Sequence, residues 1–196
     1  MFDIEKETIV LTSNDKEKAK MLEDAGFKCF CFSSLFKEYK LLSNPNITGR
    51  EFALKLSDKR AVDVGNVYPN FYVVSVVQTI ECDGKILKHP QNVEDLVSDF
   101  RTLNGKEYTV YTATTIRKNL KKRWQDIKAT RLTRKKMTEE QIHSLISEMK
   151  DSAFGVLGAV PLDKYPDVVE EKNIDPVVID GFPVKDIIHF FNTLRK

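Results

Sequence analysis

Residues 7–33, ETIVLTSNDKEKAKMLEDAGFKCFCFS, predict a strand, a helix and a second strand. The run at 7–12 is rich in β-branched residues, which favour strands. Each residue at 13–15 can cap a helix, and Gly26 is a typical helix end. The chain then returns as an apolar strand at 27–33. A strand–helix–strand order predicts that the two strands pair in parallel through a right-handed crossover.

Outward from this unit, strands and helices continue to alternate, which predicts an α/β fold with a mixed sheet. Asp83-Gly84 is a hairpin turn signal, and Thr138 with Gln141 forms a capping-box pattern. The further predicted strands are 71–80, 85–87, 107–115, 153–160 and 177–179, and the predicted helices are 49–64, 93–103, 138–149 and 184–194.

The composition is that of a soluble globular protein. The chain has 196 residues, 41% hydrophobic and 31% charged, with a net charge of only +2. Such a balance predicts neither a nucleic-acid nor a membrane partner. No apolar run approaches the roughly 20 residues that cross a bilayer, and residues 1–7 lack a signal-peptide pattern.

Three cysteines, Cys29, Cys31 and Cys82, favour a reducing, cytoplasmic location with free thiols. Cys29 and Cys31 share one face of the predicted strand. Without two more ligands at suitable spacing, we interpret them as small core residues rather than metal ligands.

Residues 117–136 hold ten basic residues and one acid, Asp126. This segment is either a ridge that binds phosphate or nucleic acid, or a solvated hairpin of strands 122–126 and 128–132 with basic residues outward. We favour the hairpin because the charge of the remaining chain is balanced.

Several short motifs follow one another in a characteristic order. A strand ends at Ser13 before a helix that contains Glu17 and Lys18, and Glu38 follows the second strand. The later motifs are Lys59-Arg60-Ala61, Gln78-Thr79, Lys88-His89-Pro90, Leu103-Asn104-Gly105-Lys106, Lys150–Gly158 and Gly181-Phe182-Pro183. In this order, from about Ile9 to Leu194, the chain resembles the Maf family of nucleotide pyrophosphatases.

The resemblance implies a single domain, residues 1–196, with an elongated mixed β-sheet flanked by helices and a cleft between two lobes. The family cuts nucleoside triphosphates to monophosphate and pyrophosphate with Mg²⁺ or Mn²⁺. A nucleoside triphosphate or other nucleotide is therefore the implied ligand, and a homodimer is the implied assembly. The implied site residues are Gln78, Glu38 and Thr79 for catalysis, Ser13, Lys18, Arg60, Lys88, His89 and Lys150 for phosphate, and Glu38 for the metal.

Some positions depart from the family pattern. Gln78 stands where the family has an Asp, and Gln is neither a general base nor a good Mg²⁺ ligand. Glu17 and Lys18 stand in place of two arginines, Tyr108 in place of a His, and Leu157 in place of a Gln.

Three hypotheses follow. The first is an active pyrophosphatase in which Glu38, with Glu81 or Asp83, holds the metal. The second is a catalytically inactive homologue that acts as a nucleotide-binding or protein-interaction module. The third is an unrelated α/β protein.

Overall fold

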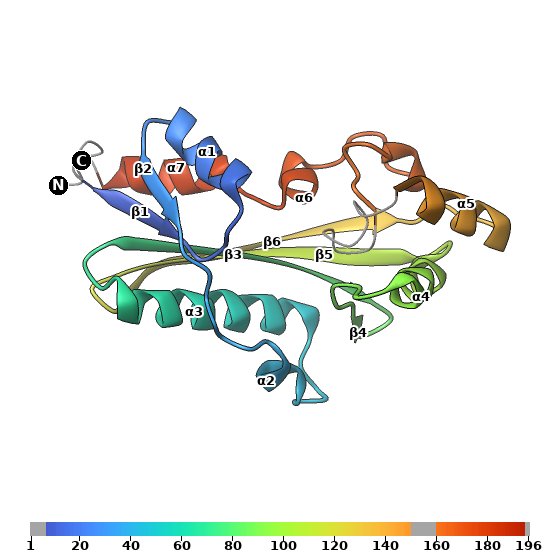
Figure 1. Ribbon diagram of the computed structural model, residues 1–196, viewed down its shortest axis with the longest axis horizontal. Helices are drawn as coiled ribbons and strands as arrows, with labels where there is room; N and C mark the ends of the chain where they lie inside the picture. The colour runs from blue at the N-terminus through green and yellow to red at the C-terminus, as the bar shows by residue number, and fades with distance from the viewer. Residues whose placement is uncertain (1–6, 150–159, 195–196) are drawn as a thin grey trace.

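The computed structural model describes residues 7–149 and 160–194. The sheet formed by these residues has six strands in the order β2-β1-β3-β5-β6, with β4 paired to β3. The pairs β1–β2 and β1–β3 are parallel, and the pairs β3–β4, β3–β5 and β5–β6 are antiparallel. The sheet is therefore mixed, and Figure 1 shows that it is elongated and flanked by helices, as the sequence predicts.

The strands are β1 (Thr8–Leu11), β2 (Lys28–Cys31), β3 (Tyr72–Cys82), β4 (Lys85–Ile86), β5 (Glu107–Lys118) and β6 (Lys121–Thr133). The helices are α1 (Lys16–Asp24), α2 (Tyr39–Leu42), α3 (Gly49–Val67), α4 (Val93–Leu103), α5 (Glu139–Met149), α6 (Pro176–Asp180) and α7 (Val184–Thr193), with a 3₁₀ turn at Pro166–Val168.

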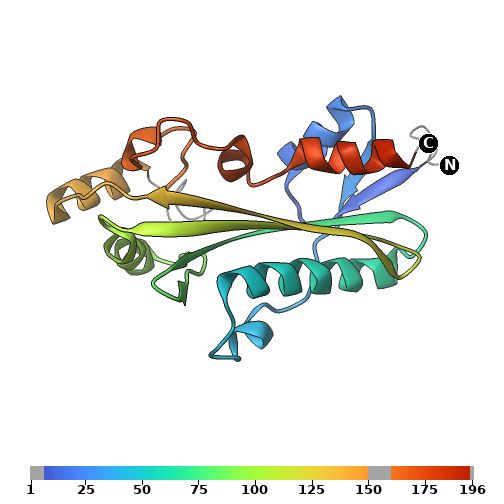
Figure 2. The ribbon, with the colours of Figure 1, turned by 180° about the vertical axis from the view of Figure 1, so that it is seen from behind.

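Helices cover both faces of the sheet. The long helix α3 lies along one face, and α1, α6 and α7 lie on the other (Figures 1 and 2). Helix α3 packs through Phe52, Ala53 and Leu56 against Val77 and Ala113 of the central strands. Burial of these apolar side chains is the main force that holds α3 to the sheet.

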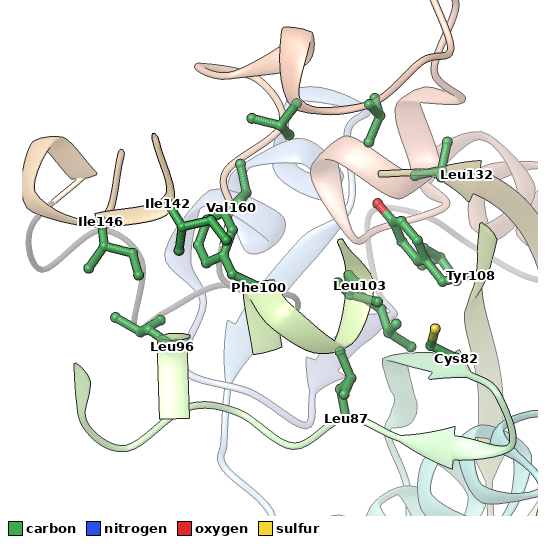
Figure 3. Packing of buried hydrophobic residues seen from close by; sticks show 14 of the residues in the cluster. Cys82, Leu87, Leu96, Phe100, Leu103, Tyr108, Leu132, Ile142, Ile146 and Val160 are labelled. Atoms are coloured by element: carbon green, nitrogen blue, oxygen red, sulfur yellow. The ribbon is translucent and has the colours of Figure 1, made fainter. Parts of the chain in front are cut away.

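The end of the molecule that carries α4 and α5 has its own apolar core. Phe100 and Leu103 of α4 and Ile142 of α5 pack with Tyr108 and Leu132 of the sheet (Figure 3). At the other end, the buried aromatic residues Phe27, Phe182 and Phe191 belong to a second cluster. The long strands β3, β5 and β6 connect the two ends.

The central strand β3 has an open stretch along one edge. Near the start of β3, Val74 O accepts a hydrogen bond of 3.1 Å from Thr12 N. Near the end of the strand, Ile80 O accepts a hydrogen bond of 2.9 Å from Leu87 N. Between these points no other strand of the described residues pairs with this edge. Backbone groups of alternate residues point to the same side of a strand, so those of Val76 and Gln78 face the opening.

Most predicted elements are confirmed, including the parallel β1–β2 pair and the turn at Asp83-Gly84. The capping box at Thr138 is also confirmed, because Thr138 and Gln141 exchange hydrogen bonds. The predicted strand at 153–160 lies outside the described residues except for Val160.

Two predictions of local structure are wrong. Residues 177–179 lie in helix α6 rather than in a strand, because Asp175 caps the helix and Pro176 opens it. The hairpin within 122–132 is absent, because Lys121–Thr133 is one strand that pairs with β5 along its length, with a single register shift between Ile116 and Arg117. The turn lies at Asn119 and Leu120, whose φ angles of 53° and 59° suit a tight two-residue hairpin.

Candidate active site

A pocket of about 420 Å³ lies at the open edge of β3. Its walls are the start of α1, the inner face of α3, the loop after β4, and the end of α6. The charged and polar residues that line it are Ser13, Asp15, Glu17, Lys18, Glu38, Arg60, Gln78, Thr79, Lys88, His89 and Asp180.

The first wall is built by the start of α1, where Asp15 is the helix cap. Its carboxylate accepts hydrogen bonds of 3.1 Å from the backbone N–H groups of Glu17 and Lys18, and lies 3.0 Å from Lys18 Nζ. Burial raises the pKa of Asp15, but its contacts with Lys18 and Glu17 outweigh this effect, so that the pKa lies below its ordinary value. A carboxylate therefore already occupies the anion-binding end of this helix.

A second group joins α3 to the segment after β2. Arg60 of α3 lies 3.2 Å from the Glu38 carboxylate in a half-buried ion pair. Burial lowers the pKa of Arg60, and the charge of Glu38 opposes that change. His89 lies at the exposed rim of the pocket. The pKa of its imidazole lies below its ordinary value, because partial loss of water and the charges of Arg60 and Lys18 lower it more than the charge of Glu38 raises it.

Gln78 holds the α6 segment against the sheet. Its Nε2 lies 3.2 Å from Thr112 Oγ1, 3.4 Å from Val177 O and 3.2 Å from Val178 O, donating to these acceptors. A Cβ added at Gly181 would lie 3.6 Å from Gln78 Oε1 and 3.5 Å from Lys18 Nζ. The glycine, with φ of +60°, thus brings the end of α6 close to both side chains.

The pocket carries more carboxylates than permanent cations among the described residues. Asp15, Glu17, Glu38 and Asp180 line it together with Lys18, Arg60 and Lys88. No group of three His, Cys, Asp or Glu side chains in the described part of the chain could hold a metal ion alone. The oxygen donors of Glu38 and Asp180 do suit Mg²⁺ or Mn²⁺ in the usual manner of phosphate enzymes, in which one or two carboxylates and the substrate phosphates share the ion.

The structure brings together Ser13, Lys18, Glu38, Arg60, Gln78, Thr79, Lys88 and His89, which the sequence analysis selected from distant segments. Lys150 lies outside the described residues. Glu81 and Asp83 do not line the pocket: Glu81 accepts a hydrogen bond from Gly49 N at the start of α3, and Asp83 pairs with Lys106.

Sequence reasoning missed two pocket carboxylates. Asp15 was considered only as a helix cap, and Asp180 was not selected because the preceding β-branched residues favoured a strand. The signal for Asp180 was Asp175-Pro176, a typical helix start that turns the chain back over Gln78.

This fold and pocket define an α/β protein with a charged pocket at the open edge of its central strand. The chain matches the Maf-like protein family over residues 8–194 and belongs to that family.

Individual relatives are moderately similar. A nucleoside triphosphate pyrophosphatase of Nitrobacter winogradskyi is 24% identical over 158 residues, which cover 80% of this chain and 78% of that protein. A dTTP/UTP pyrophosphatase of Fusobacterium nucleatum is 28% identical over 191 residues, which cover 96% of this chain and 94% of that protein. Among solved structures, a HAM1 protein from Coxiella burnetii aligns over 65% of this chain and 73% of its own, with 13% identity and a TM-score of 0.38.

Two other observations bear on partners. None of the helices in the described ranges is both long and apolar enough to cross a membrane. Within the basic segment, Arg117 and Lys122 contact Asp58, Lys118 contacts Glu7, and Lys128 contacts Asp186. These pairs offset part of the positive charge that a nucleic-acid ridge would need.

Proposed function

We propose that this chain hydrolyses nucleoside triphosphates to nucleoside monophosphate and pyrophosphate, with Mg²⁺ or Mn²⁺ accompanying the substrate. The observation that carries the proposal is the pocket itself, which gathers cationic side chains from α1, α3 and the loop after β4. The pyrophosphatase names of the relatives support the same reaction.

Three permanent cations are assigned to the phosphates. Lys18, Arg60 and Lys88 approach the pocket from three different walls, so they can contact different phosphoryl groups at once. Arg60 is the one best suited to bidentate contacts, because its guanidinium is planar. Ser13, directly after β1, supplies a neutral donor, and His89 adds an imidazole at the rim.

Two roles that Gln78 cannot perform, accepting a proton and binding the metal ion, are assigned to Asp180 and Glu38. In the reaction, a water oxygen bonds to the α-phosphorus. The bond from this phosphorus to the oxygen that bridges the α and β phosphoryl groups breaks, and pyrophosphate leaves with the electron pair. The proton of the water passes to a carboxylate, for which exposed Asp180 is the first candidate. The metal ion, when bound, neutralises phosphate charge and favours ionisation of a nearby water.

Gln78 and Thr79 are positioning residues in this scheme. The three contacts of the Gln78 amide fix the α6 segment that carries Asp180. Thr79 lines the pocket and is almost fully buried. Both side chains thus shape the site without exchanging protons.

A second candidate function is nucleotide binding without hydrolysis, in a site for a ligand or partner protein. The engaged Gln78 amide favours it, because this side chain of the central strand is neutral and already committed to hydrogen bonds. The homodimer implied by the family remains a prediction in both cases.

Release of pyrophosphate from a panel of standard and modified nucleoside triphosphates, with Mg²⁺ or Mn²⁺, tests the proposal. We expect turnover by the wild type and a decrease of about 100-fold or more in Asp180→Asn. Asp24→Asn, an exposed carboxylate on α1 outside the pocket, is the control and should retain the rate. Saturable nucleotide binding with no turnover by the wild type would contradict hydrolysis and favour the binding module.

A further inference from the structure

The segment between β2 and α2 carries Glu38 to the pocket. Figure 1 shows it crossing from β2 to the side of the sheet that α3 covers. Phe36 packs in the apolar cluster that holds α3 to the sheet, but Leu35, the residue before it, is 76% exposed. Apolar packing is non-directional, so burial of Phe36 alone does not fix the course of the backbone toward Glu38.

Asp63 of α3 supplies directed contacts to this segment. Its Oδ2 accepts a hydrogen bond of 2.8 Å from Ser34 Oγ and one of 2.7 Å from the backbone N–H of Leu35. The Ser34 hydroxyl in turn accepts a hydrogen bond of 3.1 Å from the backbone N–H of Phe36. Hydrogen bonds to a charged acceptor are directional and stronger than neutral ones, so this one carboxylate restrains three successive residues of the segment.

Asp63 and Arg60 hold the same segment from one face of α3. They are three residues apart in the helix, a spacing that makes two side chains neighbours on its surface. Arg60 pairs with Glu38, and Asp63 binds the chain at Ser34 and Leu35, just before it. Asp63 does not itself line the pocket, so its effect on a ligand there passes through the residues that it holds.

We propose that Asp63 is a positioning residue for Glu38, and that it keeps this carboxylate in place when a divalent cation and phosphate bind. The inference rests on the proposed function, in which Glu38 binds the metal ion and Arg60 binds phosphate. Both ligands compete with the pair between Glu38 and Arg60, because each attracts one of its two charges. The contacts of Asp63 involve neither charge, so they continue to restrain the segment in the loaded site.

Calorimetric titration with magnesium pyrophosphate tests the inference independently of turnover. We expect Asp63→Ala to weaken binding about tenfold, since groups that orient a metal ligand typically change metal affinity by about 10- to 100-fold. Asp63→Asn should stay within about threefold of the wild type, because its carbonyl oxygen can accept both hydrogen bonds. Asp58→Ala is the matched control: Asp58 is also half-buried on α3, but it pairs with Arg117 over 2.6 Å, outside the pocket, so affinity should be unchanged.

A double-mutant cycle separates positioning from general damage to the fold. In Glu38→Ala, which lacks the carboxylate to be positioned, the further change Asp63→Ala should alter affinity by less than about twofold. A merely structural role would weaken binding equally in both backgrounds. Without any ligand, the Leu35 amide proton should exchange with solvent several-fold faster in Asp63→Ala than in the wild type, as followed by NMR.

The outcomes distinguish this inference from the proposed function. Absence of magnesium pyrophosphate binding by the wild type contradicts the proposed function, and the positioning role with it. Wild-type binding that Asp63→Ala leaves unchanged, equal losses with and without Glu38, or unchanged exchange at Leu35 each overturns the positioning role alone. If Asp63→Ala does not fold, Ser34→Ala removes one of the same contacts from the other side; we expect a loss of about threefold, and unchanged affinity overturns the role.

Discussion

At the scale of single residues, Gln78 shows how one polar side chain of the central strand can hold a neighbouring segment in place. Its Nε2 donates toward two carbonyls of α6 and toward Thr112. A carboxylate at this position could not donate, and would face the same carbonyl oxygens. From the sequence alone we expect an Asp at this position by resemblance to the family, but the sequence does not show the contacts that Gln78 makes.

We therefore predict that Gln78→Glu, which keeps the length of the side chain, lowers the free energy of unfolding by about 1–3 kcal/mol near neutral pH. The loss arises because two α6 carbonyls lose their donor. Urea denaturation of the two proteins measures it. Gln91→Glu, an exposed glutamine outside the pocket, is the control. Unchanged stability of Gln78→Glu would mean that the α6 segment does not depend on this amide.

Asp99 of α4 gives the molecule a pH-dependent stability. Burial, with repulsion from Asp95, raises its pKa to about 6, and attraction to Arg134 opposes the rise. The folded state thus binds the proton more tightly than the unfolded chain does. The resulting stabilisation of the folded state is fully present below about pH 4 and is lost as the pH rises through 6.

Accordingly, Asp99→Asn is expected to raise the free energy of unfolding by about 1 kcal/mol at pH 7–8, since solvent screening reduces the effect at this half-buried site. Below pH 4 the variant and the wild type should be equally stable. Denaturant curves at pH 4, 6 and 8 provide the measurement, with Asp24→Asn as an exposed control. A variant less stable than the wild type at pH 8 would show that the Asp99 charge stabilises the fold.

At the scale of elements, residues typical of helix ends predicted boundaries better than hydrophobic patterns did. Thr48 caps α3 and Gly26 follows α1, as their residue types indicate. Errors arose where β-branched residues occupied a helix: Val177-Val178-Ile179 favours a strand by propensity, yet Asp175 and Pro176 fix a helix start. Tertiary contacts of Gln78 then hold that helix, and single-sequence patterns do not contain those contacts.

The start of α1 yields a prediction of its own. Asp15→Ser keeps an oxygen that can cap the helix but removes the carboxylate that pairs with Lys18. We expect stability within about 0.5 kcal/mol of the wild type, because serine is an effective cap. Affinity for pyrophosphate should rise several-fold, because a negative charge leaves the pocket and Lys18 is released.

Calorimetry with Mg²⁺ present measures this change, and Asp15→Asn, a neutral cap of equal size, should behave in the same way. Weaker pyrophosphate binding in both variants would instead assign the Asp15 carboxylate to the ligand or its metal ion.

At the scale of the whole molecule, we propose that the chain forms a single domain of two lobes with the site between them. One lobe would hold the core around Phe100 and Tyr108, and the other the core around Phe27 and Phe191. The alternation of strands and helices was sufficient to predict the mixed sheet, and the order of the motifs was sufficient to choose eight described pocket residues. It could not reveal Asp180, because the place of this residue in the pocket depends on how the α6 segment folds over the sheet.

The charge of the pocket determines a last property, its dependence on a divalent cation. Four carboxylates line it with only three permanent cations, so a triphosphate with four negative charges meets net repulsion unless an ion accompanies it. We predict that nucleoside triphosphate affinity falls at least about tenfold when EDTA replaces Mg²⁺. Glu17→Gln, an exposed residue in the first turn of α1, should reduce this dependence because it removes one repulsive charge. Titrations of a non-hydrolysable triphosphate in both buffers measure the two effects. Equal affinity with and without Mg²⁺ would show that Lys18, Arg60 and Lys88 suffice for the phosphates, and that the carboxylates of the pocket serve a ligand of different charge.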